Sequence, residues 1–581
     1  MMRARGFGTR LRMQGSTAQW RSLATICTTS ADPFPPALWP SHGDSFPSEP
    51  ACGIPDWATI NPWTLSGSNP GRCQNLVAGV WKNAAADEVI VDPLNGEPFL
   101  LVPDTSAQEC KEFVDSAARV PKHGVFNPLK NPEKYVEWGR ILHNAGHELS
   151  RPEVMDFFAK SIARVMPKSY YQAWYETKVT ADFLKNFGGD NPRFNCSGEH
   201  VSGDHTGQES KGYRWPYGPV CIVSPFNFPL EIPVLQLMGA LMMGNKPTFK
   251  ASSNVALVMD QYIRMLIASG MPAEDMDFIN TTGPTMSKLI AEAPFRVTQF
   301  TGSCEVAETL AAQTHGKVKI EDAGFDWKIF GGDVPSDPAD REFIAWTSDQ
   351  DAFACSGQKC SAQSIAFVHE NWLNDDFNLI ERMAELASRR KLDDLSIGPV
   401  LTHTTQSIME HKDRILQIPG SYTAFGGNEL QNHSVPPQYG MVEPTAVYVP
   451  ITELLKDEHF DTCTKELFGP FQVLTTYTDE QEHMVLEACE RIPHHLTAAV
   501  VSNDPRFQTR ILGSTVNGTT YCGYRARTTG APQNHWFGPA GDPRGAGIGS
   551  PYAIQLCWST HREIVHDHGE IPPHWSLPKP S

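Results

Sequence analysis

The chain has 581 residues, of which 40% are hydrophobic, and its formal net charge at pH 7 is −18. This length provides for two to four domains with full hydrophobic cores. Because no basic stripe offsets the negative charge, the composition argues against nucleic acid or an anionic membrane surface as a partner. We therefore expect a soluble globular protein.

The 13 cysteines are an odd number, and no close spacing among them indicates a zinc ligand set or a redox pair. We expect reduced thiols, an intracellular compartment and no metal site. The longest apolar stretch, residues 233–244, is too short to span a bilayer, so the sequence predicts no membrane segment.

Residues 1–30 contain several arginines, serines and threonines, and no acidic residue precedes Asp32. This composition is typical of an organelle transit peptide, and a disordered basic tail is the alternative. Residues 31–75 form a proline-rich extension, and the prolines between residues 32 and 70 predict no regular elements there.

The next segment predicts a hairpin with strands at 89–91 and 99–102. Helical patterns follow at residues 105–119, 132–149, 152–165 and 170–187. Residues 188–211 are polar and contain glycine, which indicates a loop or an exposed ribbon.

From Pro219 onward, strands and helices alternate. Strands are predicted at 220–224, 246–250, 276–280, 297–300 and 317–320, with helices at 230–243, 255–269, 285–292 and 305–314. This alternation is the pattern of a doubly wound parallel sheet, which binds nucleotides outside the carboxyl ends of its strands. A second alternating set has strands at 365–368, 445–449, 471–476 and 496–501, and a glycine-rich loop follows at 538–549.

Cys360 lies in a turn of small residues, between a predicted helix at 338–354 and a predicted strand at 362–368. Free backbone N–H groups at such a connection lower the pKa of a thiol and can bind an oxyanion. The simpler alternative is an inert buried cysteine, since most free cysteines behave as small hydrophobic residues. Cys360 is therefore a candidate nucleophile only in combination with other motifs.

Four other positions carry modest signals when each is taken alone. Asn227 follows a strand with its side-chain amide available, although many asparagines simply occupy turns. Gly302 and Ser303 begin a helix whose N–H groups suit a phosphate, but the G-x-G-x-x-G fingerprint is absent. Glu321 ends a strand and could act as a general base, although a solvated charge is commoner. Residues 465–470 form an ordinary turn before a strand.

Together and in this order, the motifs resemble those of the aldehyde dehydrogenase superfamily, most closely the plant-type pyrroline-5-carboxylate dehydrogenases, which are mitochondrial. The resemblance covers nearly everything after residue 75. The matching residues are Pro225 to Pro229, Lys250 with Ser252 and Ser253, Phe300 to Ser303, Glu321, Gly357 to Cys360, and Glu466 to Pro470; the stretch from Asn534 to Pro543 is the most characteristic.

The resemblance implies that Cys360 attacks the aldehyde carbon, that the Asn227 amide and the Cys360 N–H bind the oxyanion, and that Glu321 activates water. It also implies NAD as the cofactor. The residues it assigns to the cofactor are Ser224, Pro225, Phe226, Lys250, Ser252, Ser253, Gly302, Ser303, Glu466 and Phe468.

The implied reaction is oxidation of glutamate γ-semialdehyde, the open form of pyrroline-5-carboxylate, to glutamate in the mitochondrial matrix. For its α-carboxylate we predict Lys359 and Ser361 beside the nucleophile, and Gly545, Ala546 and Gly547 as a segment that resembles the family's aldehyde anchor. The alternative for Lys359 is a side chain in solvent.

The implied fold is α/β, with a Rossmann-type NAD-binding domain at 76–320 and an α/β catalytic domain at 321–545. Residues 195–213 and the C-terminal segment 546–581 would form a β-ribbon oligomerisation arm, giving a homo-oligomer, either a dimer or a dimer of dimers.

Three departures from the family pattern remove no reacting group. The segment Glu321 to Gly324 lacks the usual sequence after the base, Ala307 replaces a glycine, and Ser253 replaces an acid that often follows the ribose lysine. Because of the last departure, the sequence leaves open whether the enzyme prefers NAD or NADP. The sequence is also compatible with a dehydrogenase of another semialdehyde, a cofactor-free thiol hydrolase or acyl-transferase, and a non-catalytic scaffold.

Overall fold

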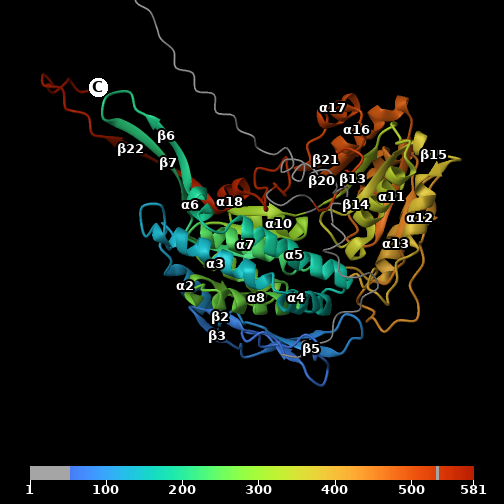
Figure 1. Ribbon diagram of the computed structural model, residues 1–581, viewed down its shortest axis with the longest axis horizontal. Helices are drawn as coiled ribbons and strands as arrows, with labels where there is room; N and C mark the ends of the chain where they lie inside the picture. The colour runs from blue at the N-terminus through green and yellow to red at the C-terminus, as the bar shows by residue number, and fades with distance from the viewer. Residues whose placement is uncertain (1–52, 323, 531–534) are drawn as a thin grey trace, which may run out of the picture. The chain divides into compact units, whose positions relative to one another are not determined.

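The computed structural model describes residues 53–322, 324–530 and 535–581 (Figure 1). Residues 1–30, expected to form a transit peptide, lie outside the described residues. In the described ranges no helix is both long and apolar enough to cross a membrane.

The first sheet has seven strands in the order β12-β11-β8-β9-β10-β2-β3. Its parallel part comprises β8 (Pro219–Val223), β9 (Lys246–Lys250), β10 (Asp277–Phe278), β11 (Thr298–Thr301) and β12 (Val318–Glu321), and β2 (Asn75–Val77) and β3 (Val80–Lys82) run antiparallel at one edge. The predicted doubly wound parallel sheet is thereby confirmed.

Apolar side chains on both faces of this sheet are buried under helices. Along β8, Val220 and Ile222 belong to one hydrophobic cluster and Cys221 to another. The first cluster includes residues of α3 (Glu133–Leu149), α4 (Pro152–Val165), α5 (Tyr170–Asn186), α7 (Glu231–Met242) and α8 (Ala256–Ala268). The second includes residues of α2 (Cys110–Ala118), α9 (Gly283–Glu292) and α10 (Cys304–Gln313). Alternate burial along a strand is what a sheet covered on both faces requires.

The predicted helix at 105–119 begins later than expected, at Cys110. Ser106 and Glu109 form a local turn, in which the Ser106 hydroxyl donates to the Glu109 carboxylate at 2.7 Å and accepts the Glu109 N–H at 3.3 Å. The Ser106 N–H also donates to the Glu109 carboxylate at 2.9 Å, and the Cys110 N–H donates to the Ser106 carbonyl at 3.0 Å, so this reciprocal pair caps the start of the helix.

The second sheet also has seven strands, in the order β17-β18-β19-β14-β13-β20-β21. All but the antiparallel edge strand β17 are parallel, and the strands are β13 (Asp326–Phe330), β14 (Gln363–His369), β17 (Tyr422–Phe425), β18 (Thr445–Tyr448), β19 (Phe471–Tyr477), β20 (Thr497–Val501) and β21 (Thr519–Cys522). On one face lie α11 (Pro338–Phe353) and α12 (Leu379–Ala387); on the other lie α13 (Thr405–Ile415), α14 (Ile451–Leu454), α15 (Asp457–Cys463), α16 (Glu482–Arg491) and α17 (Pro505–Leu512).

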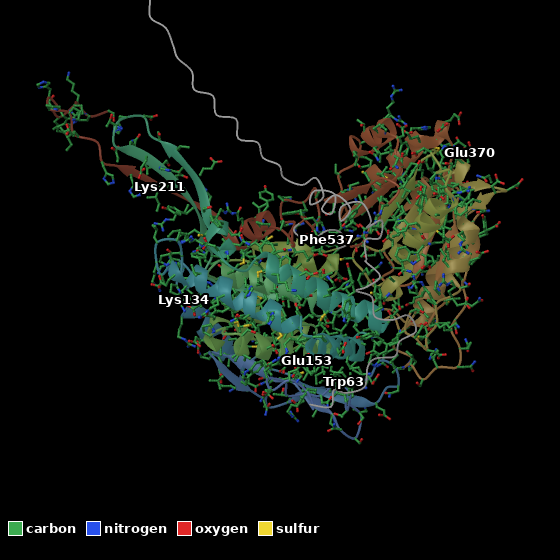
Figure 2. The ribbon with its side chains drawn as sticks, in the orientation of Figure 1. Trp63, Lys134, Glu153, Lys211, Glu370 and Phe537 are labelled. Atoms are coloured by element: carbon green, nitrogen blue, oxygen red, sulfur yellow. The ribbon has the colours of Figure 1, made fainter. Side chains whose placement is uncertain are left out.

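Three antiparallel strands form an arm, ordered β22-β7-β6, that extends away from the first sheet's helices (Figure 1). They are β6 (Ser197–Ser202), β7 (Gln208–Pro216) and β22 (Ser559–Asp567), and Lys211 marks β7 in Figure 2. The helices α6 (Asn191–Asn195) and α18 (Pro551–Trp558) lead into it. The predicted ribbon therefore exists, and the C-terminal segment pairs with it along the whole length of β22.

The end of the proline-rich extension packs against the first hydrophobic cluster. Residues 53–70 contain no helix or strand, as predicted, yet Trp57 stacks on Phe158 with ring centroids 5.7 Å apart, and Trp63 packs beside Phe157 (Figure 2). Beyond them β1 (Gly71–Arg72), β4 (Asp87–Val91) and β5 (Pro98–Pro103) form a small sheet, in which β4 and β5 are the predicted hairpin.

Candidate active site

The loop that carries Cys360 joins α11 to β14 through a strained turn. Cys355, Ser356 and Gly357 have φ angles of 56°, 55° and 67°, so two non-glycine residues adopt the left-handed conformation. Such residues persist only where the surrounding structure determines them, and they cluster at functional sites. Here the Ser356 hydroxyl accepts the N–H of Gly398 at 2.8 Å, which helps to hold the turn.

Close contacts on both sides clamp this loop. A Cβ atom on Gly357 would lie 2.0 Å from the carbonyl oxygen of Gly469, so only glycine fits there. The buried side chain of Gln358 donates to the Pro399 carbonyl at 3.0 Å and accepts the Leu401 N–H at 2.8 Å. The predicted turn at 465–470 is thereby packed directly against the Cys360 loop.

Glu321, at the end of β12, lies beside Cys360. Its side chain is 3% exposed, and burial raises the pKa of the carboxyl group to about 7. Burial, together with the neighbouring carboxylate of Glu321, raises the pKa of the Cys360 thiol well above its ordinary value. Both oxygens of Glu321 are buried, and neither has a hydrogen-bond partner among the described residues. The pair is thus a thiol next to a carboxyl group that titrates near neutral pH.

The Asn227 side chain reaches the same loop from the first sheet. Asn227 lies between β8 and α7, is 3% exposed, and its Nδ2 donates to the main-chain carbonyl of Gln358 at 3.2 Å. An amide NH₂ group has two donors, so one N–H remains for a ligand. The Asn227 amide is therefore bonded to Gln358, which precedes Cys360 by two residues.

The residues expected to bind cofactor lie at the carboxyl ends of β8, β9 and β11, as parallel sheets of this type predict. The Lys250 ammonium is 8% exposed and donates to the Ala251 carbonyl at 3.0 Å, and burial lowers its pKa. The Ser224 N–H donates to the Lys250 carbonyl at 3.0 Å, which joins β8 to β9. Pro225 is half-buried beside this junction, as are Ser252 and Ser253.

The α10 N-terminus forms the next part of this edge. Gly302 and Ser303 are exposed, and Ser303 is the N-cap of α10. The Gly302 N–H donates to the main-chain carbonyl of Glu321 at 3.1 Å. The expected phosphate-binding turn is thus bonded to the residue expected to be the base.

Glu466 and Phe468 complete the set from the second sheet. Burial raises the pKa of Glu466 to about 8, and its carboxylate accepts the N–H of Gly324. The Phe468 ring meets Phe226 edge to face, with centroids 5.8 Å apart. Residues about 240 positions apart in the chain are therefore in contact.

The residues expected to bind the substrate carboxylate have mixed placements. Lys359 is 3% exposed, and its ammonium donates to the Gln350 carbonyl in the last turn of α11 at 2.8 Å, so it does not point into solvent. Ser361 lies 3.0 Å from the Thr529 hydroxyl, oxygen to oxygen. The role predicted for Lys359 stays a prediction.

The segment 545–547 packs along the free edge of β12. The N–H groups of Gly545 and Ala546 donate to the carbonyls of Asp542 and Ile320 at 2.9 and 2.8 Å, and Ile320 in turn donates to Arg544. A Cβ atom on Gly547 would lie 2.4 Å from the Trp536 ring. Two of the N–H groups expected to bind substrate are thus engaged within the protein, and that role also stays a prediction.

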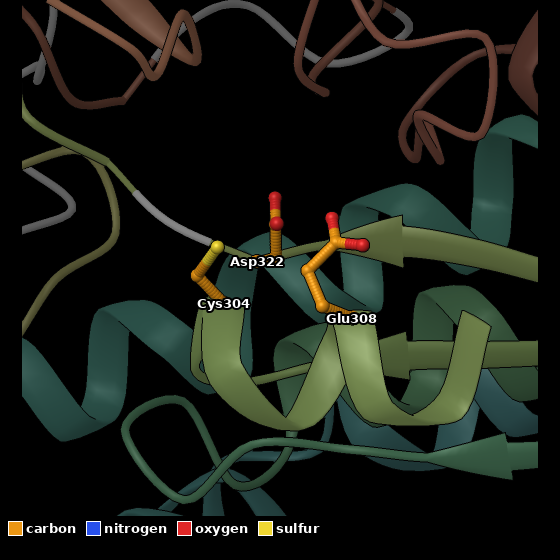
Figure 3. A group of neighbouring side chains, drawn as sticks. All are labelled: Cys304, Glu308 and Asp322. Atoms are coloured by element: carbon orange, nitrogen blue, oxygen red, sulfur yellow. The ribbon is translucent and has the colours of Figure 1, made fainter. Parts of the chain in front are cut away.

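Two residues of α10 and one residue that follows β12 have the donor types of a metal site. The ligand atoms of Cys304, Glu308 and Asp322 lie within 4.8 Å of one another (Figure 3). The Arg544 guanidinium pairs with Glu308 at 2.7 Å, which compensates the acidic charge. We assign no metal to this group.

Three features escaped the sequence-based prediction. Thr529 approaches Ser361 from a distant loop, Gly324 packs against Cys360, and a buried ion pair of Lys168 and Glu176 lies beneath Asn227. None of them carries a local sequence signal, because their roles depend on contacts between distant segments.

Comparison with known proteins identifies the family to which the sequence is similar. The model of the aldehyde dehydrogenase family matches residues 81–541. The chain is 57% identical over 523 residues to the mitochondrial delta-1-pyrroline-5-carboxylate dehydrogenase 12A1 of Arabidopsis thaliana, which covers 90% of this chain and 93% of that protein. A probable aldehyde dehydrogenase of Linum usitatissimum is 56% identical over 90% of this chain and 94% of its own length.

Solved structures share the fold at lower identity. The crystal structure of a 1-pyrroline-5-carboxylate dehydrogenase from Thermus with bound NAD matches with a TM-score of 0.73 and 18% identity, covering 86% of this chain and 94% of that one. A putative aldehyde dehydrogenase from Burkholderia cenocepacia matches with a TM-score of 0.74 and 20% identity, over 87% of this chain and 99% of that one. At these identities the likeness shows the fold alone.

Proposed function

The chain belongs to the aldehyde dehydrogenase family, and we propose that it oxidises glutamate γ-semialdehyde, the open form of 1-pyrroline-5-carboxylate, to glutamate with NAD as the oxidant. The observation that carries the chemistry is the place of the buried, unpartnered Glu321 carboxyl group beside the Cys360 thiol, with the Asn227 amide held on the same loop. The substrate follows from the 57% identity to the Arabidopsis enzyme. A cofactor-free thiol hydrolase is disfavoured, since the neighbour of the thiol is a carboxylate.

Cys360 begins the reaction by giving its proton to Glu321, whose pKa near 7 suits this transfer at neutral pH. The sulfur then bonds to the aldehyde carbon, and the carbonyl electrons move to the oxygen. Asn227 Nδ2 and the Cys360 N–H would stabilise that oxyanion, the kind of preorganised donor set that lowers acyl-transfer barriers. Loss of hydride from the carbon restores the carbonyl and leaves a thioester on Cys360.

Glu321 first releases the thiol's proton to solvent and then takes a proton from water, whose oxygen attacks the thioester carbon. The carbon–sulfur bond breaks, the Cys360 thiolate takes a proton from Glu321, and glutamate leaves as the carboxylate after its acid proton passes to solvent. Because neither oxygen of Glu321 has a hydrogen-bond partner among the described residues, the carboxylate can bond to that water.

The residues present fit a dinucleotide. A buried lysine, Lys250, and the N-terminus of α10 lie on one edge of the first sheet, as a ribose and a pyrophosphate require. Glu466 and the ring pair Phe226–Phe468 would hold the nicotinamide ribose beside Cys360. When bound, NAD accepts the hydride that leaves the aldehyde carbon.

The α-carboxylate of the substrate requires a polar group near Cys360. The hydroxyls of Ser361 and Thr529 lie 3.0 Å apart directly after the nucleophile, and the Thr529 hydroxyl donates to the Ser361 carbonyl at 3.0 Å. The Ser361 hydroxyl, positioned by Thr529, can donate to a carboxylate, and we assign it this role, with Gly547 as a further candidate.

Two wider properties belong to the same proposal. The arm of β6, β7 and β22 exposes Val201 and Val565, at 54% and 59%, which supports its use in a homo-oligomer. The acid-free N-terminus, together with the mitochondrial relative, supports import into the mitochondrial matrix.

The test is an assay of reduced nicotinamide with a panel of aldehydes and both cofactors. We expect glutamate semialdehyde with NAD to give the highest kcat/KM. A preference for another semialdehyde would contradict the proposed substrate. Thioester hydrolysis without aldehyde oxidation would contradict the proposed reaction.

A further inference from the structure

A fully buried ion pair lies directly beneath Asn227. Lys168, just before α5, and Glu176, on α5, both have side chains that are 0% exposed, and Nζ and Oε2 are 2.9 Å apart. Long charged side chains are almost never fully buried unless they are paired, so this pair requires an explanation. It has no place in the chemistry described above.

The pair bonds to both ends of the turn that carries Asn227. Lys168 Nζ donates to the Asn227 carbonyl at 2.9 Å and lies 4.4 Å from the centre of the Phe228 ring. Glu176 Oε1 accepts the N–H groups of Leu230 and Glu231, at 2.9 and 3.3 Å, where α7 begins. One ion pair thus fixes the main chain of residues 227–231.

Stability alone does not account for such a pair. Desolvation of two buried charges offsets much of their attraction, and hydrophobic replacements of buried pairs are often equally stable. What the pair adds is directional bonding to a turn whose first residue must present an amide N–H within a narrow range of position.

We propose that Lys168 and Glu176 are positioning residues for Asn227: through the main chain of the 227–231 turn, they hold its side-chain amide against the loop that carries Cys360. The proposal rests on the proposed function, in which Asn227 binds the oxyanion. The bond from Asn227 Nδ2 to the Gln358 carbonyl holds the amide and leaves its second N–H for the oxyanion.

The first experiment is a double-mutant cycle in the full-length enzyme with Lys168→Met and Asn227→Ala. Loss of an oxyanion donor costs roughly a hundredfold to a thousandfold in kcat, so Asn227→Ala should fall in this range. Lys168→Met should lower kcat roughly tenfold to a hundredfold with little change in the Kd for NAD. In the Asn227→Ala background the same change should cost about twofold or less, because coupled residues are not additive.

A second readout separates positioning from general damage. Alkylation of Cys360 by iodoacetamide is a displacement at an sp³ carbon that forms no oxyanion, so its rate in Lys168→Met should match wild type. The matched control is Arg264→Met, which breaks the largely buried ion pair between Arg264 and Asp260, 2.9 Å apart. Both residues lie on α8, which belongs to the first hydrophobic cluster, as α5 does. We expect this control to lower the Tm without the drop in kcat.

Where Lys168→Met alone fails to fold, Lys168→Met with Glu176→Gln leaves no unpaired charge and keeps an acceptor for Leu230 and Glu231. This double variant should show the same kcat loss, because the bond to the Asn227 carbonyl is still missing. Equal effects of Lys168→Met in the wild-type and Asn227→Ala backgrounds, or a parallel loss of alkylation rate, would overturn the positioning role. An unchanged kcat in Asn227→Ala would instead remove the oxyanion role of Asn227, and with it this inference.

Discussion

A Cβ atom on Gly324 would lie 1.8 Å from the main-chain carbonyl oxygen of Cys360. The nucleophile loop and the segment after β12 therefore touch backbone to backbone. The N–H of the same glycine donates to Glu466. Because it has no side chain, Gly324 lets the segment after Glu321, the proposed nucleophile Cys360 and the proposed ribose ligand Glu466 come together.

We predict that Gly324→Ala displaces the Cys360 loop. A displacement near 1 Å can cost about a hundredfold in rate, so kcat should fall on that order. The control is Gly283→Ala, since a Cβ atom there meets nothing within 4 Å. Steady-state kinetics measure both, and wild-type kcat in a folded Gly324→Ala enzyme would show that the contact is not needed.

The pH dependence of turnover should report Glu321. Since burial raises its pKa to about 7, the carboxylate is protonated at lower pH and cannot accept a proton. We expect kcat, measured from pH 5 to 9 where hydrolysis of the thioester limits turnover, to rise with pH to a plateau above about 7. A profile that is flat across this range would contradict the assignment of the base.

The same shift predicts a stability effect. The folded protein binds the Glu321 proton more tightly than the unfolded chain, so its contribution to stability is present below about pH 4.5 and is lost as pH rises through about 7. Glu321→Gln removes this loss, which amounts to about 3 kcal/mol for a shift of this size. The difference in Tm between the variant and wild type should therefore be larger, in favour of the variant, at pH 8 than at pH 5. Calorimetry at the two pH values measures this difference, and the same value at both would argue against a raised pKa.

Cys360→Ala should abolish aldehyde oxidation and leave NAD affinity nearly intact. Cys355→Ala is the matched control, because Cys355 is in the same strained turn and is 5% exposed, yet alanine tolerates its φ of 56° no worse than cysteine. Fluorescence titration measures NAD binding. Loss of activity from Cys355→Ala alone, in a folded protein, would reassign the nucleophile.

Substitution of Lys359 tests which residue binds the α-carboxylate of the substrate. Its ammonium is bonded to Gln350, so we expect Lys359→Met to lower kcat/KM equally for glutamate semialdehyde and for an uncharged aldehyde of similar length. Ser361→Ala should discriminate, with a loss on the order of tenfold confined to the charged aldehyde. A loss from Lys359→Met that is larger for the charged aldehyde would support the role predicted from the sequence.

Residues 1–40, fused to a fluorescent reporter, should direct it to mitochondria. Their arginines without acidic residues are the basis of the expectation. The control carries glutamate at Arg3, Arg5, Arg10 and Arg12. Diffuse cytosolic fluorescence of the unmodified fusion would refute the predicted mitochondrial localisation.

Regular elements with strong periodicity were predictable from the sequence. The alternation between residues 219 and 321 marks a doubly wound sheet, and α4 has the bounds that its proline and apolar spacing predict. β13 was not predicted as a strand, because Lys328 interrupts its apolar pattern; the structure pairs that lysine with Asp351 inside the protein. β22 also lacks an apolar pattern, since it is stabilised by pairing with β7.

The site shows the same division. Motif residues such as Cys360 and Glu321 could be named because each follows a helix or strand at an informative position. Lys168 and Gly324 could not, since an isolated lysine or glycine is common and its meaning depends on the distant backbone it contacts. The ammonium of Lys359 could not be placed either, because burial against α11 is a tertiary property.

The central claim is that Cys360 forms a thioester with glutamate semialdehyde that Glu321 helps to hydrolyse. Intact-mass spectrometry of Glu321→Gln, incubated with glutamate semialdehyde and NAD, tests nucleophile, base and substrate together. We predict one reduced nicotinamide per site and a mass increase of one glutamyl group, which peptide mapping assigns to Cys360. Unmodified protein that turns over at the wild-type rate, or acylation of another residue, would contradict the account.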